Sequence, residues 1–219
     1  MPNFLKDILE ENNFQVEEID SEVLIVKSFL SKEELDKIFD VIESTPNEEW
    51  FIEYNANLKN FCMQKFGRDD VENLVAEGKF EITQNWQDKN LNIGKYTFQR
   101  ALFDRLNDLV QKVDNSLELS GFATIQRMQE GVELKAHTDQ HTDPSIKHAA
   151  ILYLNDDYVD GELFFVNSGL ELKPKPGSLV LFPGNDEYNH GVRHVGAGPI
   201  RYVLVSFIKE KGFYEKNRY

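Results

Sequence analysis

The chain has 219 residues, 41% of them hydrophobic, which suits one domain with a sizeable core. It carries 38 acidic and 24 basic side chains, for a formal net charge of −14. An acidic surface repels phosphate groups and no basic stretch of useful size interrupts it, so we expect no binding to nucleic acid.

The cysteine content and the apolar runs predict the compartment. Cys62 is the only cysteine, so no internal disulfide can form, which is typical of a reducing compartment. The first residues, MPNFLKDILEE, have acids where a signal peptide has a basic flank and a long apolar run. No apolar stretch reaches the roughly 18 residues that span a bilayer. We therefore expect a cytoplasmic protein without membrane contact; nothing in the sequence indicates an oligomeric state.

Residues 1–120 are predicted to form a helical buttress with outer strands. Residues 22–27 (EVLIVK) are β-prone, and Ser31 with Glu34 has the spacing of a capping box at the start of a helix. A second helix is expected over 97–114. Its apolar stripe indicates core packing and consists of Leu102, Leu106, Leu109, Val110 and Val113.

Two segments allow more than one interpretation. The polar residues 82–96, within the less regular stretch 50–96, fit a loop over a site and an exposed connection equally well. Residues 140–147 are a second segment that could border the mouth of a site.

Residues 121–208 have a different pattern, in which short β-prone runs alternate with turn residues. Many short strands with regular turns are typical of a β-sandwich or barrel. The runs are 122–128, 132–136, 147–154, 161–166, 178–182, 190–195 and 200–208. We expect an α+β chain, mainly β, with one domain over 1–219, its β core at 121–208 and a tail at 209–219.

The histidines point to a metal site. All five lie between positions 137 and 194. Residues at i and i+2 of an extended strand face the same side, so His137 and Asp139 can reach one ion together. Two histidines and one carboxylate form the facial triad of non-haem iron oxygenases, which leaves coordination positions open. Strand spacing does not distinguish His190 from His194 as the second histidine.

A second histidine-aspartate pair repeats the spacing four residues later. His141 and Asp143 lie in the turn-like segment QHTDPS, whereas His137 follows a β-prone run. We therefore interpret the later pair as a solvated loop.

Arg201 lies in a β-prone run whose alternate residues are apolar. It shares a strand face with Val203, Val205 and Phe207, so its guanidinium is expected to point inward. A buried guanidinium needs a partner, either a carboxylate of the protein or a bound dicarboxylate. Tyr153, in AAILYLN, could add a hydroxyl to the same ligand or be an ordinary core tyrosine.

The stretch from about Gly121 to Ile208 resembles the prolyl 4-hydroxylase-like branch of the 2-oxoglutarate/Fe(II)-dependent dioxygenases. GVELKAHTD is similar to the strand that leads into the family's HxD pair, and ILYLNDDYVDGELFF to its tyrosine-bearing strand and the next turn. LKPKPGSLVLFPG and HGVRHVGAGPIRYVLVSFI are similar to the strand before the distal histidine and to the histidine-to-arginine run after it. Residues 23–44 are similar to the family's opening strand and helix.

This resemblance implies a double-stranded β-helix, or jelly roll, with supporting N-terminal helices. It implies Fe(II), 2-oxoglutarate and O2 as cofactor and co-substrates, with ascorbate as an optional reductant, and hydroxylation of a C–H bond. The leading substrate is a peptidyl prolyl residue. The implied ligands are His137, Asp139 and His190 for iron, with His190 favoured over His194 by the HGV run, and Arg201 and Tyr153 for 2-oxoglutarate.

The sequence departs from the family pattern at two positions of interest. Met128 stands where the family often has a tyrosine, so one contact to 2-oxoglutarate or substrate is either missing or supplied from elsewhere. Asp160 replaces the first glycine of a GGEL-like turn, which predicts a different shape for that turn.

Other functions stay open beside prolyl hydroxylation. The same scaffold suits a hydroxylase of a free amino acid or another small molecule, and a catalytically inactive jelly-roll binding domain. A nucleic-acid repair oxygenase is disfavoured, since that class often has a second arginine six residues after the first, where this chain has Phe207.

Overall fold

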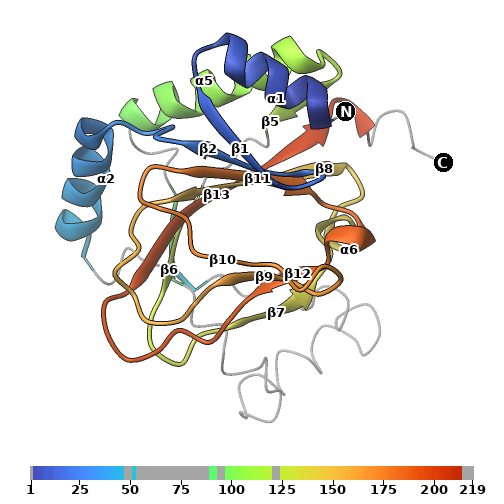
Figure 1. Cartoon of the computed structure of the whole chain (residues 1–219). Helices are drawn as coiled ribbons and strands as arrows, with labels where there is room; N and C mark the ends of the chain where they lie inside the picture. The colour runs from blue at the N-terminus through green and yellow to red at the C-terminus, as the bar shows by residue number, and fades with distance from the viewer. Residues whose placement is uncertain (1, 47–50, 53–88, 93–96, 120–123, 214–219) are drawn as a thin grey trace, which may run out of the picture.

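The computed structural model describes residues 2–46, 51–52, 89–92, 97–119 and 124–213 (Figure 1). Two antiparallel sheets face one another, one of nine strands and one of four. The order in the larger sheet is β1-β2-β11-β8-β13-β6-β4-β3, and β5 also pairs with β13. Its strands are β1 (Gln15–Asp20), β2 (Val23–Lys27), β3 (Phe51–Ile52), β4 (Lys89–Asn92), β5 (Leu117–Leu119), β6 (Thr124–Met128), β8 (Ile146–Tyr153), β11 (Leu179–Pro183) and β13 (Arg201–Glu210).

The smaller sheet has the order β10-β9-β12-β7. Its strands are β10 (Glu171–Leu172), β9 (Leu163–Phe165), β12 (His190–Val192) and β7 (Leu134–His137). The chain crosses repeatedly between the two sheets, as in a jelly roll. The predicted double-stranded β-helix is confirmed, and a strand begins within two residues of the start of each β-prone run predicted over 121–208.

The helices cover the outer face of the larger sheet. Figure 1 shows α1 (Pro2–Glu11) and α5 (Thr97–Val113) lying across it, with α2 (Lys32–Ser44) at one side. Strand β8 shows how the two faces differ. Its Ala150 and Leu152 pack in the core cluster beneath the helices, whereas Ala149, Ile151 and Tyr153 pack between the sheets. The alternation follows from the two-residue period of a strand, and it places Tyr153 inside the roll.

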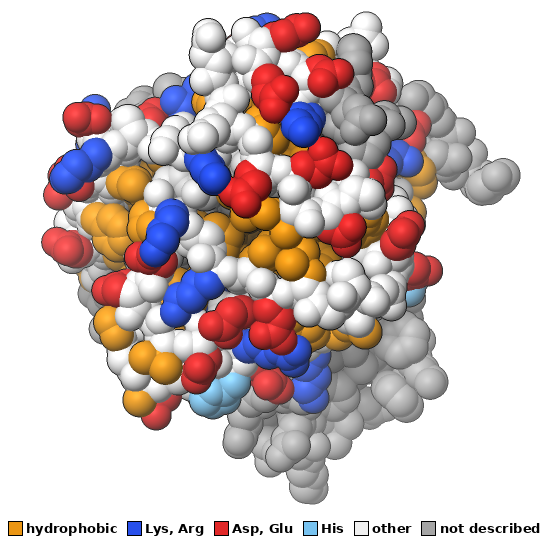
Figure 2. Space-filling view, in the orientation of Figure 1, with side chains coloured by type: hydrophobic (Ala, Val, Ile, Leu, Met, Phe, Trp, Pro, Cys, Tyr) orange, Lys and Arg blue, Asp and Glu red, His pale blue; other side chains and the backbone are white. Residues whose placement is uncertain are grey.

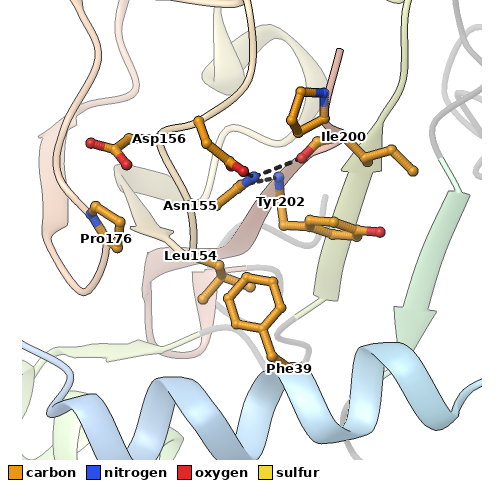
Figure 3. Close-up of a pocket in the computed structure, with 9 residues that line it drawn as sticks. Phe39, Leu154, Asn155, Asp156, Pro176, Ile200 and Tyr202 are labelled. Carbon is orange, nitrogen blue, oxygen red and sulfur yellow. Dashed lines mark hydrogen bonds between the residues drawn. The ribbon is translucent and has the colours of Figure 1, made fainter.

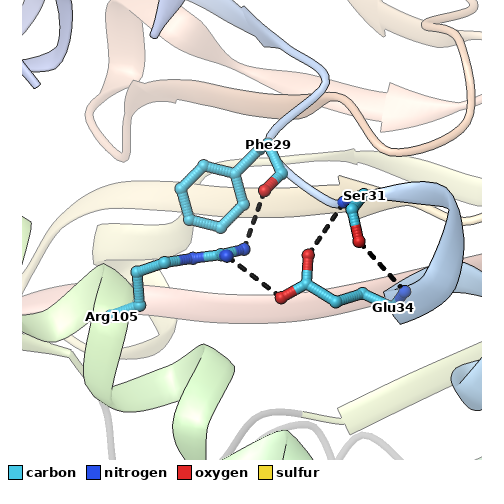
Figure 4. Close-up of polar contacts among 4 residues, drawn as sticks. All are labelled: Phe29, Ser31, Glu34 and Arg105. Carbon is cyan, nitrogen blue, oxygen red and sulfur yellow. Dashed lines mark hydrogen bonds and ion pairs between the residues drawn. The ribbon is translucent and has the colours of Figure 1, made fainter. Parts of the chain in front are cut away.

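The start of α2 is the predicted capping box, and it also anchors α5. The Ser31 hydroxyl accepts a hydrogen bond from the Glu34 backbone N–H, and the Glu34 carboxylate accepts one from the Ser31 backbone (Figure 4). Arg105 of α5 donates to the same carboxylate at 3.0 Å and to the Phe29 carbonyl at 2.7 Å. Its guanidinium also lies 4.5 Å from the centre of the Phe29 ring. These contacts fix α2 relative to α5.

One helix of the predicted buttress was not located by the sequence, and two other features differ from the sequence-based expectations. The acidic N-terminal segment forms a helix whose Ile8 and Leu9 are buried, since its apolar residues recur at helical spacing. Residues 89–92 of the polar segment form β4, which pairs with β6. Strand β13 runs to Glu210, so the tail begins later than 209.

Other expectations lie outside the described residues. These are the remainder of 82–96, Cys62 and the side chain of Leu102. Leu106, Leu109 and Val110 of the same stripe are buried as predicted. Among the described residues, no helix is both long and apolar enough to cross a bilayer.

The surface charge is mixed on the face seen in Figure 2. Lysine and arginine side chains lie interspersed with aspartate and glutamate, with hydrophobic side chains between them. Several form ion pairs there or elsewhere on the surface, such as Lys32 with Asp36 and Lys175 with Asp156. The described part of this face therefore offers no continuous basic surface to a polyanion.

Candidate metal centre and 2-oxoglutarate pocket

Two histidines meet across the smaller sheet. His137 ends β7, His190 begins β12, and the two are register partners in the antiparallel pairing. Their ring centroids lie 4.5 Å apart. The next residue, Gly191, allows this approach, because a Cβ there would collide with the Leu134 backbone oxygen and lie 2.7 Å from the Phe164 ring.

Asp139 is placed by one extended residue. Thr138 has extended backbone angles, so the side chains of His137 and Asp139 point to the same side, as predicted, although Asp139 begins the short helix α6 (Asp139–Thr142) and is not in a strand. The Asn189 side-chain amide donates to the Thr138 hydroxyl at 3.2 Å and so ties this residue to the start of β12.

The three side chains form a compact set of possible metal ligands. Nε2 of His137 lies 3.6 Å from Oδ1 of Asp139, and Nε2 of His190 lies 3.9 Å from Oδ2. One ligand atom from each residue falls within 4.8 Å of the others. These separations are too long for hydrogen bonds, and the nitrogen and oxygen donors surround a common point.

Both imidazoles are oriented by backbone carbonyls. Nδ1 of His137 lies 2.9 Å from the Lys135 oxygen, and Nδ1 of His190 lies 3.0 Å from the Tyr188 oxygen. A carbonyl oxygen only accepts, so each Nδ1 carries a proton and each Nε2 is the ring atom left to bind a metal. Such contacts fix the tautomer that a metal ligand needs.

Burial shapes the electrostatics of this cluster. Asp139 and His190 are each 4% exposed, and Asp139 Oδ2 has no hydrogen-bond partner among the described residues. Burial lowers the pKa of His190 to about 4, so its imidazole is neutral at physiological pH. Burial is the largest single effect on the pKa of His137 and lowers it, but the contact with Asp139 and the backbone contacts of Lys135 and His190 together leave the pKa raised.

The remaining predicted alternatives lie elsewhere. His194 is exposed, and its backbone oxygen accepts from Gly161. His141 is exposed as expected and lies 2.9 Å from Asp186. Asp143 differs from the expected solvated loop, because its half-buried carboxylate pairs with Lys209 at 2.8 Å and accepts from Ser145.

Arg201 lies inside the roll, as its strand pattern predicts. It is 1% exposed and stands opposite Met128 in the pairing of β13 with β6. Its Nη2 donates to the Tyr153 hydroxyl and its Nη1 contacts the Met128 sulfur, both at 3.3 Å. Within the described part of the chain, no carboxylate pairs with this guanidinium and its Nε has no partner. A buried charge with only weak acceptors fits a bound anion.

The arginine and the histidines share a core. Tyr153 packs in the same cluster as Phe165 and Phe182, between the two sheets. The rings of these phenylalanines lie 6.1 Å and 4.5 Å from the His190 ring, measured between centroids. The cluster therefore connects the possible metal ligands to the Arg201–Tyr153 pair.

Asn155 is a positioning residue that sequence reasoning missed. Its side chain donates to the Ile200 carbonyl at 2.7 Å and accepts from the Tyr202 backbone N–H at 2.8 Å (Figure 3). It thus holds the backbone on both sides of Arg201. The available signal was a lone asparagine directly after the tyrosine-bearing strand, where an amide commonly bonds to backbone.

A pocket of about 430 Å³ lies on the other face of β13 (Figure 3). It contains none of the histidines, and both of its carboxylates have protein partners: Asp156 pairs with Lys175, and Asp157 accepts from Asn155. Phe39 of α2 points into it beside Leu154, which belongs to the outer core. We therefore do not place the chemistry there, despite its volume.

The turn at Asp160 keeps the backbone conformation of a glycine. Asp160 has φ +51° and Gly161 has φ +70°, both in the left-handed region. Aspartate tolerates this region better than most residues, which explains how it replaces a glycine here.

Comparisons with known proteins identify the family of this core. Residues 123–209 match the sequence model of the 2OG-Fe(II) oxygenase superfamily. These residues form a 2OG-Fe(II) oxygenase domain. Among curated proteins, no sequence matches the chain.

Solved structures with the same fold include prolyl hydroxylases. The oxygenase aligns with a Trichoplax adhaerens prolyl hydroxylase, solved with a hypoxia inducible factor oxygen degradation domain peptide fragment, at a TM-score of 0.63 and 15% identity, over 100% of this chain and 93% of that one. The viral collagen prolyl hydroxylase of Paramecium Bursaria Chlorella virus-1, in its 2OG complex, aligns at 0.58 and 13% identity, over 86% and 96%. A Burkholderia pseudomallei oxidoreductase of the 2OG-Fe(II) oxygenase family gives 0.58 and 13%, over 94% and 89%.

The domain formed by residues 123–209 is of a kind that uses Fe(II) and 2-oxoglutarate. Its own residues fit both groups. The orphaned Asp139 oxygen and the two Nε2 atoms match the donors that iron takes in facial triads. The buried guanidinium of Arg201, beside a phenol and without a carboxylate among the described residues, matches one end of a dicarboxylate.

Proposed function

We propose that this dioxygenase hydroxylates a peptidyl prolyl residue. In this proposal His137, Asp139 and His190 hold Fe(II), and Arg201 with Tyr153 holds the far carboxylate of 2-oxoglutarate. The observation that carries the proposal is the pairing of β7 with β12, which gathers the three ligand atoms within 4.8 Å beside the core that contains Tyr153.

The protein side of the mechanism follows from this geometry. The carbonyls of Lys135 and Tyr188 hold the imidazoles with Nε2 free to bind metal, and the single carboxylate of Asp139 leaves coordination positions for small ligands. Arg201 and Tyr153 orient the co-substrate from its far end. Fe(II) with 2-oxoglutarate and O2 supplies the oxidation, in which 2-oxoglutarate becomes succinate and carbon dioxide and the substrate gains one oxygen atom.

The prolyl substrate is supported by the kind of proteins that share the fold. Two of them are named as prolyl hydroxylases, and the structure of one contains a peptide fragment. At 13% and 15% identity these likenesses show the fold alone, so a free amino acid or another small molecule is the alternative that the experiment has to separate.

The first experiment measures conversion of 2-oxoglutarate to succinate with Fe(II), ascorbate and O2. Wild type and His141→Ala, which changes an exposed histidine of the neighbouring pair, should give slow turnover, and His137→Ala should give none. Proline-containing peptides and free amino acids are then compared. A peptide that gains the mass of one oxygen atom, in step with succinate, supports prolyl hydroxylation; coupling only to a free amino acid supports the alternative.

Metal and 2-oxoglutarate binding by calorimetry covers the case without turnover. If wild type binds both the metal and 2-oxoglutarate and His137→Ala loses metal binding, the protein is an oxygenase whose turnover is tightly coupled to a substrate absent from the assay. A wild-type protein that binds neither would refute the proposal and favour an inactive jelly-roll domain.

A further inference from the structure

Tyr158 is a buried residue to which the proposed function assigns no role. It lies in the connection between β8 and β9 and is 2% exposed. Its hydroxyl has no hydrogen-bond partner among the described residues. Leaving a buried hydroxyl unpaired destabilises a protein, so a native protein that keeps such a group commonly uses it for a ligand.

The ring of Tyr158 is held in place on two sides. Lys173 lies 4.4 Å from the ring centre and donates to the Tyr158 carbonyl. On another side, a Cβ at Gly161 would lie 3.3 Å from Tyr158 Cδ2 and 3.3 Å from Arg201 Cδ. The lack of a side chain at Gly161 thus lets the tyrosine and the arginine approach one another.

The Arg201 guanidinium lies between two phenols. Its central carbon is 5.3 Å from the Tyr153 ring centre and 5.7 Å from that of Tyr158. The other contact of the guanidinium is the thioether of Met128, which has no proton to donate. Of the side chains known to contact Arg201, the two tyrosines therefore offer the hydroxyl donors for an anion bound to it.

We propose that Tyr158 is a further ligand of 2-oxoglutarate, donating its hydroxyl to the far carboxylate held by Arg201 and Tyr153. This inference rests on the proposed function of that pocket. Met128 on β6 has no hydroxyl to offer 2-oxoglutarate, and in this proposal Tyr158 of the β8–β9 connection supplies that contact. Burial raises the pKa of Tyr158 to about 12, so the hydroxyl keeps its proton over the working range of pH.

The test is the affinity of Mn(II)-loaded protein for two ligands, measured by calorimetry without turnover. 2-Oxoglutarate has the far carboxylate, and pyruvate keeps the 2-oxo acid but lacks it. Tyr158→Phe should bind 2-oxoglutarate about 10- to 100-fold more weakly than wild type, as expected for one hydrogen bond to a charged group, and should bind pyruvate equally well.

A matched control and a stability measurement separate a ligand contact from a structural one. Tyr202→Phe removes a hydroxyl on the opposite face of β13, where the side chain lines the outer pocket, and should bind both ligands like wild type. The thermal midpoint of metal-loaded Tyr158→Phe without 2-oxo acid should equal or exceed that of wild type, because the hydroxyl has no described protein partner.

Three outcomes overturn the inference. Unchanged affinity of Tyr158→Phe for 2-oxoglutarate removes its basis, and an equal loss of affinity for pyruvate shows a general effect on the site. If wild-type protein binds the metal but neither 2-oxo acid, the proposed function itself is refuted, and the role of Tyr158 with it. This result is obtained before any variant is compared, so it is distinguishable from the other two.

Discussion

Arg201→Met tests whether the buried guanidinium serves a ligand or the fold. Arg201 is 1% exposed, and no carboxylate in the described part of the chain pairs with it. Replacing a buried charged group by an apolar one of similar volume is often neutral or stabilising by about 1–4 kcal/mol. The Tyr153 hydroxyl loses its hydrogen-bond partner in the variant, which reduces this gain in stability by about 1 kcal/mol.

The net change for the protein without 2-oxo acid therefore lies between about 1 kcal/mol of lost stability and about 3 kcal/mol of added stability. At about 2–4 °C per kcal/mol for a chain of this size, the thermal midpoint should rise by up to roughly 10 °C. The same substitution should weaken the binding of 2-oxoglutarate. Removing one partner of a buried charged pair costs about 2–5 kcal/mol, so affinity should fall about 30- to 4,000-fold.

Thermal unfolding of Mn(II)-loaded protein, with and without 2-oxoglutarate, measures both effects. At about 100 times the wild-type dissociation constant, the ligand should stabilise wild type by about 2.7 kcal/mol and the variant by less than about 1 kcal/mol. Arg193→Met is the control, since that arginine is half exposed and paired with Glu171 on the surface. A variant that binds 2-oxoglutarate like wild type, or one that is several kcal/mol less stable without it, would refute the reasoning.

Three further changes test the structure around the site. Burial, with Lys147 adding to it, lowers the pKa of His148 from 6.5 to about 4. The unfolded chain therefore takes up this proton more readily, and up to about 3 kcal/mol of the stability present above pH 6.5 is lost as the pH falls to 4. His148→Gln should flatten this pH dependence, measured by urea unfolding at several pH values. Gly191→Ala should lower both the thermal midpoint and the calorimetric Mn(II) affinity, because its Cβ forces β12 away from β7. Glu34→Ala removes half of the capping box and the pair with Arg105, and should cost about 1–2 kcal/mol in urea unfolding.

Each of these three predictions has a result that contradicts it. An equally steep loss of stability in His148→Gln would assign the acid sensitivity to other groups. Wild-type Mn(II) affinity in Gly191→Ala would mean that the ligands do not depend on close pairing of the strands. Glu33→Ala, which changes an exposed residue of the same helical turn, is the control for Glu34→Ala, and an equal loss in both would exclude a specific role for the cap.

The parts of the site that could be predicted are those where strand periodicity determines the direction of a side chain. The two-residue period of a strand predicted that His137 and Asp139 face the same side and that Arg201 points inward, and the structure has both. The choice of His190 over His194 needed the resemblance to a family, because it depends on which histidine stands opposite β7. That register follows from the pairing of distant strands, which spacing along the chain does not encode.

The misses have a common physical cause. Helix α1 comes from an acidic segment and strand β4 from a polar one, and each packs or pairs with an element far away in the sequence. Asn155 and Tyr158 lie in a connection, where polar and aromatic residues have many ordinary uses. Their roles depend on three-dimensional contacts with residues 200–202, which become visible only when β8 lies beside β13.

The two ends of the site rest on strands of very different length. Arg201 begins a strand of ten residues that lies between β6 and β8 in the larger sheet, whereas His137 and His190 lie on strands of four and three residues. Short strands with few ladder hydrogen bonds open locally at a lower free energy than long central ones. The proposed metal end is therefore expected to open locally at a lower free energy than the proposed 2-oxoglutarate end, which would let iron exchange with the solution without unfolding of the protein.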